Sequence, residues 1–475
     1  MTRGLSSGAT AGVGQANAND VRVAAGVAAP APRSLHDVIV IGGGLAGLAT
    51  ARQLQVQGAD VLLLEARSRV GGRVHTEVLD TGQAIDLGAQ FIGDAQSRIS
   101  ALVDQVGLTR VRPHEKGDHL YFQPDDGRPL RVSGDELPLP LPGQIDAFFA
   151  RRRFHRGVVA HRDRVGRLDV MPASVMIRKF TCTRVAASFL SGFVEGEMCV
   201  SLDDISAYEL LSQAATIGGL GAQAASEQWF LAEGAGPLAQ HLRAGLGRFV
   251  VLDSPVQRVE VKADRVSVET PRGIHSAAQL VVAVPPQLYE RLSLLPWLPP
   301  EHASVLRRYQ RGHAVKTLLA FDLPWWRTVG LSGRVQDPAG LFNVAIDASP
   351  GDDRLGLLVL FSTAASGRLL SATPTEAGRI ELALGWLRGL GAATVPPLRA
   401  ARSIDWNADP WSLGGYASRR APGGWQEAPA LFASRSRIHF AGTETATTWR
   451  SFMEGALESA ERAAEAALRG AAPQA

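Results

Sequence analysis

Three glycines near the start of the chain have the spacing that lets a backbone turn wrap a pyrophosphate: Gly42, Gly44 and Gly47. They follow the apolar run 37–41 and precede a segment with helical apolar spacing, so we expect them to join a buried strand to a helix. Such glycines permit a tight turn, and the N-terminus of the helix attracts phosphate. A second apolar run, 59–64, ends at Glu65, close to the spacing of about 20 residues expected of an acid that holds ribose hydroxyls. This order of features predicts a dinucleotide-binding unit.

A basic segment follows that acid and adds charge that a nicotinamide-binding fold does not need. It contains three arginines and a glycine pair: Arg67, Arg69, Arg73 and Gly71–Gly72. The glycine pair lets the chain pass close to a ligand, and an arginine beside it can neutralise pyrophosphate with bidentate bonds. Another motif, 440–444, lies near the opposite end of the chain and leads to Phe452-Met453-Glu454-Gly455. Together the two motifs indicate one FAD held at both of its ends by a single fold.

The segment Glu65–Arg73 closely resembles the signature of the flavin amine oxidase family. That family includes monoamine and polyamine oxidases, L-amino-acid oxidases and lysine-specific histone demethylases, and the chain is most similar to a monoamine oxidase of bacterial type. The resemblance covers about residues 36–469, with a poorly matching stretch between about 125 and 185. It implies contacts with FAD, among them a valine backbone at the adenine and a tryptophan beside the flavin. The implied cofactor-binding residues are Gly42, Gly44, Leu45, Ala46, Gly47, Glu65, Ala66, Arg67, Gly72, Arg73, Gly88, Ala89, Gln90, Phe91, Val256, Trp406, Gly442, Glu444 and Met453.

The same resemblance implies a catalytic face made of two aromatic rings that flank the path to the flavin. Alignment with the family places these rings at Tyr416 and Phe452. Aromatic faces attract cations by about 0.5–2 kcal/mol. Many family members also carry a lysine shortly after a Pro-Pro pair, where it holds a water at the flavin N5; counted from Pro285–Pro286, that place is Arg291, and Lys316 is the alternative. An arginine stays protonated, so it would position water or oxygen rather than transfer a proton.

Some monoamine oxidases attach FAD through a cysteine one place before the first aromatic ring. Gly415 occupies that place here, and Cys182 and Cys199 are distant from it in the sequence. We therefore expect non-covalent FAD. A helix beginning near Phe452 would direct its positive end to the flavin and stabilise negative charge on the reduced ring.

The resemblance implies oxidation of an amine to the imine, which is hydrolysed to an aldehyde or ketone plus ammonia while oxygen is reduced to hydrogen peroxide. L-amino-acid oxidases carry an arginine for the substrate carboxylate where this chain has Phe91, which favours a primary monoamine. A polyamine would require acids at the entrance, and four are candidates: Glu195, Glu197, Asp203 and Asp204. The alternatives are a polyamine or L-amino-acid oxidase, an amine dehydrogenase or desaturase that uses another electron acceptor, and a non-catalytic FAD-binding protein.

The composition is that of a water-soluble globular protein. The chain has 475 residues, of which 45% are hydrophobic, and a formal net charge of +3. Its most basic run, Arg151–Arg156, is better explained as a solvated helix face than as a nucleic-acid site. Two cysteines give neither a disulfide framework nor a metal site and favour a reducing compartment. Because no run approaches about 18 apolar residues, we expect a cytoplasmic enzyme whose partners are an amine and oxygen, without nucleic acid or membrane; a homodimer stays open.

The predicted fold class is α/β, in an α+β arrangement of two domains. A Rossmann-like FAD-binding domain is expected to be interleaved with a substrate-binding domain of mixed sheet plus helices. The FAD-binding domain is assigned to 35–115, 232–290 and 400–470, the substrate-binding domain to 116–231 and 291–399, and a flexible N-terminal extension to 1–34. In the substrate-binding domain we expect strands near 316–322, 341–346 and 355–361 and helices near 206–215 and 300–311.

Overall fold

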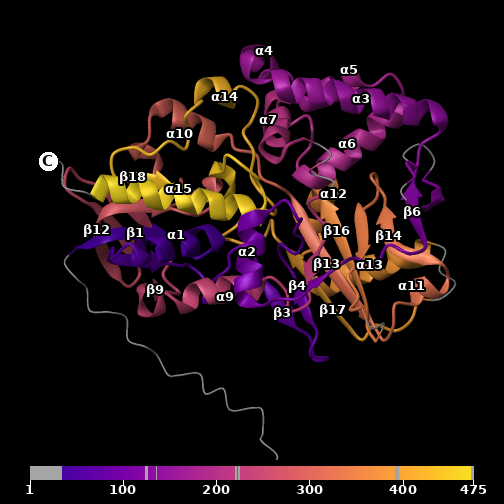
Figure 1. The fold of residues 1–475 in the computed structure, drawn as a ribbon, viewed down its shortest axis with the longest axis horizontal. Helices are drawn as coiled ribbons and strands as arrows, with labels where there is room; N and C mark the ends of the chain where they lie inside the picture. Colours follow the sequence, from indigo (N-terminus) through magenta and orange to yellow (C-terminus); the bar gives the residue numbers. More distant parts are fainter. Residues whose placement is uncertain are drawn as a thin grey trace, which may run out of the picture.

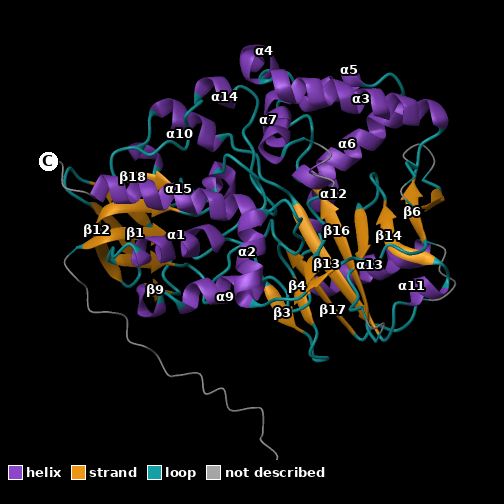
Figure 2. Ribbon diagram, in the orientation of Figure 1, coloured by secondary structure: helices purple, strands orange, loops and turns teal. Residues whose placement is uncertain are grey.

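The computed structural model of the chain describes residues 35–123, 127–134, 136–219, 222, 225–351, 354–390 and 395–471. The predicted N-terminal extension therefore lies outside the described residues. Two seven-stranded sheets stand beside one another, each covered by helices (Figures 1 and 2). This two-part arrangement of mixed helix and sheet confirms the predicted fold class.

The first sheet contains the predicted strand–turn–helix unit. Its strand order is β10-β11-β12-β1-β2-β9. β18 pairs with the C-terminal end of β12, and β11 pairs with the N-terminal end. The strands are β1 (His36–Ile41), β2 (Val61–Leu64), β9 (Val250–Val251), β10 (Arg258–Val261), β11 (Val266–Thr270), β12 (Gly273–Val282) and β18 (Ile438–Phe440). β1 lies between β2 and β12 and is parallel to both. Its apolar run is buried because helices and loops cover both faces of the sheet.

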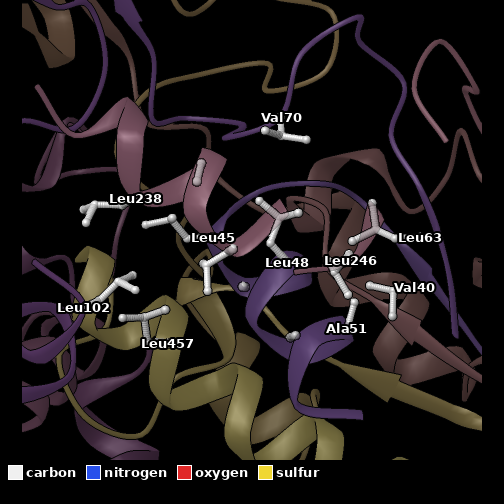
Figure 3. Close-up of a cluster of buried hydrophobic side chains, with 14 of the residues drawn as sticks. Val40, Leu45, Leu48, Ala51, Leu63, Val70, Leu102, Leu238, Leu246 and Leu457 are labelled. Atoms are coloured by element: carbon white, nitrogen blue, oxygen red, sulfur yellow. The ribbon is translucent and has the colours of Figure 1, made fainter. Parts of the chain in front are cut away.

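Helices from both ends of the chain share the core on one face of this sheet. They are α1 (Leu45–Val56), α2 (Ser97–Val106), α9 (Gly236–Ala244) and α15 (Met453–Ala471). Figure 3 shows Leu48, Leu102, Leu238 and Leu457, one from each helix, gathered near Val40 and Leu63 of the sheet. Burial of each such side chain stabilises the fold by about 1.5–3 kcal/mol. The last of the described helices, α15, is thus part of the same core as α1. The other face carries α10 (Pro300–Arg307), against which α14 (Gly424–Glu427) packs.

The second sheet has the order β17-β13-β16-β15-β14-β6-β7. Its strands are β6 (Asp118–Phe122), β7 (Pro129–Ser133), β13 (Ala314–Phe321), β14 (Leu331–Gln336), β15 (Val344–Asp347), β16 (Gly356–Thr363) and β17 (Ala400–Asp405). β13, β15 and β16 confirm the strands expected there. β17 pairs with β13, so the chain returns to the first sheet after Asp405 and not at residue 400.

Three helices pack on the second sheet: α11 (Trp325–Thr328), α12 (Ala364–Ser371) and α13 (Glu376–Gly389). Five further helices pack mainly on one another: α3 (Leu141–Ala160), α4 (Val165–Leu168), α5 (Ala173–Phe180), α6 (Arg184–Met198) and α7 (Ala207–Ile217). Two short ribbons connect the halves: β3 (Thr76–Val78) with β4 (Ala84–Asp86), and β5 (Arg110–Val111) with β8 (Phe230–Leu231). None of the described helices is long and apolar enough to cross a membrane.

Candidate active site

The turn after β1 has the backbone geometry that the glycine spacing predicts. Gly42 adopts a φ of +104°, which an L side chain rarely adopts. A Cβ on Gly47 would lie 1.9 Å from the Gly42 carbonyl oxygen, so the first turn of α1 can approach the end of β1 only with glycine there. The turn leaves the N-terminus of α1 open to the cavity beside it, because Gly44 and Leu45 both line that cavity.

Glu65 closes the predicted dinucleotide unit at the end of β2. Its side chain is 3% exposed, and its Oε2 accepts a hydrogen bond from the Gly43 amide at 2.6 Å. Its Oε1 accepts from the Arg67 amide at 2.9 Å. The glycine turn therefore holds the carboxylate in the cavity wall, as expected of a group that binds ribose.

The arginines of the basic segment link distant parts of the chain. Arg67 Nη2 donates to Asp409 Oδ1 at 2.5 Å and to Ser412 Oγ at 2.9 Å. Arg73 donates from Nη1 and Nη2 to the two carboxylate oxygens of Glu444 at 2.6 and 3.0 Å. Burial alone would raise the pKa of Glu444, but the Arg73 guanidinium holds that pKa below its ordinary value. The two terminal motifs therefore meet in one charged pair.

One cavity contains most of the predicted site residues. Those that line it are Gly42, Gly44, Leu45, Ala46, Glu65, Arg67, Gly72, Arg73, Gly88, Ala89, Gln90, Phe91, Trp406, Tyr416, Gly442, Phe452 and Met453. Four predicted cofactor residues are not among its lining: Gly47, Ala66, Val256 and Glu444. Gly47 packs against the turn, Val256 is buried in the core on the opposite face of the sheet, and Glu444 lies behind Arg73.

The structure corrects the assignment of Arg291. This side chain is exposed, and its Nη1 donates to the Pro410 carbonyl oxygen at 2.8 Å, outside the cavity lining. The alternative, Lys316, lies in the cavity on β13. Counting along the chain from the Pro-Pro pair failed because the segment after it, including Leu292 and Leu294, packs into the core on the other face of the first sheet. The chain next lines the cavity at β13.

Lys316 is almost completely buried, with 3% of its surface exposed. Its Nζ donates to Gln90 Oε1 at 2.7 Å and to the Gly88 carbonyl oxygen at 3.0 Å. Burial lowers the pKa of Lys316 to about 8, although the carboxyls of Asp86 and Glu227 act in the opposite direction. The ammonium group can therefore lose and regain a proton near neutral pH.

The two predicted aromatic rings line the same cavity as Lys316. Tyr416 is held at a φ of +53°, and its backbone carbonyl accepts from Arg73 Nη1 at 2.5 Å. The Phe452 ring packs edge-on against Trp449, with centroids 5.4 Å apart. Burial raises the pKa of the Tyr416 phenol well above its usual value, so this ring remains neutral. Trp406 forms part of the wall, with its indole nitrogen donating to the Leu87 carbonyl oxygen at 2.9 Å.

Sequence reasoning missed several polar residues of the cavity: Gln213, Glu227, Arg419 and Ser451. None of them belongs to a motif, and they converge only through folding. Glu227 lies where this cavity meets a second hollow, which also contains Arg334 and the α6 residues Phe189 and Phe193. Burial raises the pKa of Glu227, and Arg334 and Lys316 partly oppose that shift.

Of the four acids considered for an entrance, only Glu197 lines the cavity. Glu195 accepts from the Leu202 amide at 2.9 Å, Asp203 accepts from the Ser174 hydroxyl, and Asp204 faces Arg368 at 3.8 Å. These three acids therefore have structural partners. Glu197 and Glu227 both lie on the boundary between the cavity and the second hollow.

The cavity fits FAD on its own geometry. A Cβ on Gly72 would lie 3.3 Å from the Gly44 Cα, and one on Gly88 would lie 2.1 Å from the Arg73 carbonyl oxygen, so bare backbone forms the wall at both places. The N-termini of α1 and α15 both meet the cavity, where they favour negative charge. Gly415 also lines it, whereas neither of the described cysteines does, in agreement with a non-covalent cofactor.

Comparison with known proteins gives the same result as the geometry. The model of the flavin containing amine oxidoreductases matches residues 45–468. A Mycobacterium tuberculosis protein, AofH, whose name contains the words flavin-containing monoamine oxidase, is 30% identical over 441 residues, which span 90% of this chain and 95% of that protein. An L-amino acid dehydrogenase of Synechocystis is 30% identical over 472 residues, which span 92% and 96%. The fold is shared with putrescine oxidase bound to putrescine, at a TM-score of 0.84 and 23% identity over 92% of this chain and 99% of that chain.

Proposed function

Because the chain belongs to the family of flavin-containing amine oxidoreductases, we propose that it oxidises a primary monoamine and passes the electrons to oxygen. The observation that carries this proposal is that Tyr416, Phe452 and Lys316 lie on one cavity with the FAD-binding turn. The two rings supply apolar surfaces for a neutral amine, and Lys316 supplies a buried group that titrates near neutral pH.

The cavity wall supports a substrate without a carboxylate. Phe91 and Phe361 add apolar surface beside the two rings, and no cation stands at position 91. Arg419 also lines the cavity, but its Nη1 donates to Gln213 Oε1 at 2.8 Å and faces Glu209 at 3.9 Å. A substrate carboxylate would have to compete with these partners, which favours an amine over an amino acid.

Electrons and protons balance in the proposed reaction. Bound FAD would supply the acceptor for two electrons and the hydrogen of the substrate α-carbon. The amine nitrogen loses one proton as the carbon–nitrogen double bond forms, and water then converts the imine to an aldehyde or ketone plus ammonia. Oxygen takes up two electrons and two protons to form hydrogen peroxide. We assign Lys316 Nζ to hold a proton beside this chemistry, while Tyr416 and Phe452 orient the amine and exclude water.

A diamine is the second candidate, and one observation favours it. Glu197 and Glu227 lie next to Tyr416 at the boundary with the second hollow, where a carboxylate could bind a distal ammonium group. Putrescine oxidase, which shares this fold, binds such a diamine.

The experiment that separates the two candidates is anaerobic reduction of the purified holoenzyme by butylamine and by putrescine. A monoamine oxidase is expected to lose its flavin absorbance at least about tenfold faster with butylamine, because the unpaired second ammonium of putrescine is costly to bury. A preference for putrescine that Glu227→Gln abolishes, and that the surface variant Asp204→Asn retains, would establish the diamine instead. A flavin that no amine reduces would refute both candidates.

Readmission of air tests the electron acceptor. Rapid return of the flavin absorbance with stoichiometric peroxide supports oxygen, whereas slow return without peroxide would support a dehydrogenase. We also propose that the enzyme works in the cytoplasm, because its two cysteines are free thiols, as in proteins of reducing compartments.

A further inference from the structure

The outer face of α3 exposes an unusual combination of side chains. The inner side of this helix packs on α5, α6 and α7, and Figure 1 shows α3 at the upper edge of the half that contains the second sheet. Its exposed apolar side chains, with the exposed fraction of each, are Leu141 (68%), Ile145 (52%), Phe148 (53%), Phe149 (48%) and Val159 (73%). Large apolar side chains gathered on one surface are uncommon in a monomer and mark a contact site.

Basic side chains are interleaved with these apolar ones. Arg151, Arg152, His155 and Arg156 are all exposed on α3. Because residues three, four and seven positions apart share a helix face, Leu141, Ile145 and Phe148 continue into Arg152, His155 and Val159 along one stripe. The Arg152 guanidinium lies 4.7 Å from the centre of the Phe148 ring. The outer face of α3 therefore exposes cationic and apolar side chains next to one another.

Negative charge is missing from this face. α3 is described along its whole length and contains one acid, Asp146, which is only 6% exposed. Asp146 accepts hydrogen bonds from the amides of Cys182 and Thr183 at 2.8 and 2.6 Å, on the inner side of the helix. An ordinary solvated helix alternates both signs of charge, so solvation alone does not explain the outer face of α3.

We propose that the outer face of α3 docks on the surface of an anionic phospholipid bilayer. The phenylalanines and aliphatic side chains enter the boundary between head groups and acyl chains, while the arginines extend along them to the phosphates. Each arginine near an anionic surface strengthens binding about fivefold. The helix lies on the membrane and does not span it, which agrees with the lack of a membrane-crossing helix among the described residues.

Other occupants fit this face less well. A nucleic acid would use the arginines and rings but would gain nothing from Leu141, Ile145 and Val159. A second copy of the chain, paired through the same face, would bring arginine against arginine. The sequence predicted no membrane partner because it lacks a segment that could span a bilayer. A helix that docks on the surface of a bilayer needs no such segment.

The test is cosedimentation of the FAD-loaded, full-length protein with vesicles. Binding is expected to vesicles of phosphatidylglycerol mixed with phosphatidylcholine, to weaken as salt is added, and to be absent with phosphatidylcholine alone. Arg151→Gln combined with Arg152→Gln should lower the affinity about 25-fold. Phe148→Ser combined with Phe149→Ser should lower it at least about tenfold.

A matched control pair is available on α13, where Leu382 is 41% exposed and Arg388 is exposed. Leu382→Ser combined with Arg388→Gln should leave vesicle binding unchanged, and every variant should retain its flavin spectrum and amine oxidation. The proposal is overturned if anionic vesicles do not bind the protein, or if the α3 variants bind them as wild type does. Dimers that the α3 variants dissociate, or RNA that competes fully in the absence of vesicle binding, would assign the face to those partners instead.

Discussion

Arg73 and Glu444, which are 371 positions apart in the chain, form a bidentate ion pair at 2.6 and 3.0 Å. The pair joins the basic segment after β2 to the motif after β18. Arg73 also holds the Tyr416 carbonyl, so the same guanidinium connects the cofactor-binding motifs to one of the two aromatic rings. A single guanidinium therefore connects all three segments of the cavity wall.

Glu444→Gln should weaken both the fold and FAD binding. The carboxylate is 2% exposed and Arg73 is 23% exposed, so the substitution leaves a largely buried cation without its charge partner. We expect the free energy of unfolding to fall by about 3 kcal/mol. Thermal unfolding of the apoprotein and FAD titration would measure the two effects. An apoprotein of unchanged stability would show that the pair matters for the cofactor alone.

Lys316→Met should slow the reaction of the reduced enzyme with oxygen. The substitution keeps the length of the side chain but removes the donor to Gly88 and Gln90, and we expect the oxygen step to slow about a hundredfold. Because the pKa of Lys316 is about 8, the group is charged below that pH and neutral above it. Stopped-flow profiles of the wild type should therefore change near pH 8, and the Lys316→Met profile should be flat there. The control is Arg291→Met, on the surface, and an equal effect of both variants would exclude the role given to Lys316.

Gly47→Ala should weaken FAD retention. The added Cβ would lie 1.9 Å from the Gly42 carbonyl oxygen, and the turn would have to open. Overpacking of about 1–3 kcal/mol corresponds to FAD binding about 5- to 150-fold weaker. Gly385→Ala, in α13, has nothing within 4 Å of the new Cβ and should slightly stabilise the protein. The ratio of flavin to protein absorbance after gel filtration measures FAD retention in each variant. Equal ratios in Gly47→Ala and Gly385→Ala would contradict the tight turn.

Acid should destabilise the protein through His439. This residue of β18 is 3% exposed, and its Nε2 lies 3.0 Å from Gln279 Oε1. Burial, with help from the charge of Arg469, lowers the pKa of His439 from 6.5 to about 4. Because the unfolded chain binds a proton that the folded chain excludes, stability is fully present above pH 6.5 and is lost as the pH falls towards 4. The loss reaches up to about 3 kcal/mol. Urea unfolding between these pH values should show a slope that His439→Asn flattens, whereas an unchanged slope would assign the effect to other groups.

Much of the cofactor site was predictable because local spacing determines it. Gly42, Gly44, Gly47 and Glu65 belong to one strand–turn–helix–strand unit, whose geometry follows from short stretches of sequence. Three strands of the second sheet were also predictable, since β13 and β16 are rich in apolar and β-branched residues and β15 lies within the third expected range. The rest depended on the resemblance to a family, which located Tyr416 and Phe452.

The residues that were missed depend on tertiary contacts. Glu227 and Arg419 come from segments without a motif, and only the fold brings them to the cavity. Arg291 was misassigned because distance along the chain is a poor guide where the segment between the Pro-Pro pair and β13 packs away from the cavity. Val256 was predicted to contact adenine through its backbone; its side chain lies in the core, and the backbone contact stays a prediction. Such positions cannot be located from periodicity or spacing alone.

The shared core of α1 and α15 has a consequence for biosynthesis. The glycine turn is synthesised long before Leu457 and Glu444, which complete its core and its charge pair. A nascent chain that stops short of β18 therefore exposes the apolar side of α1 and holds an unpaired Arg73. Tight flavin capture must wait until α15 has been synthesised and folded, so the yellow colour of a preparation reports protein in which this helix has reached the core.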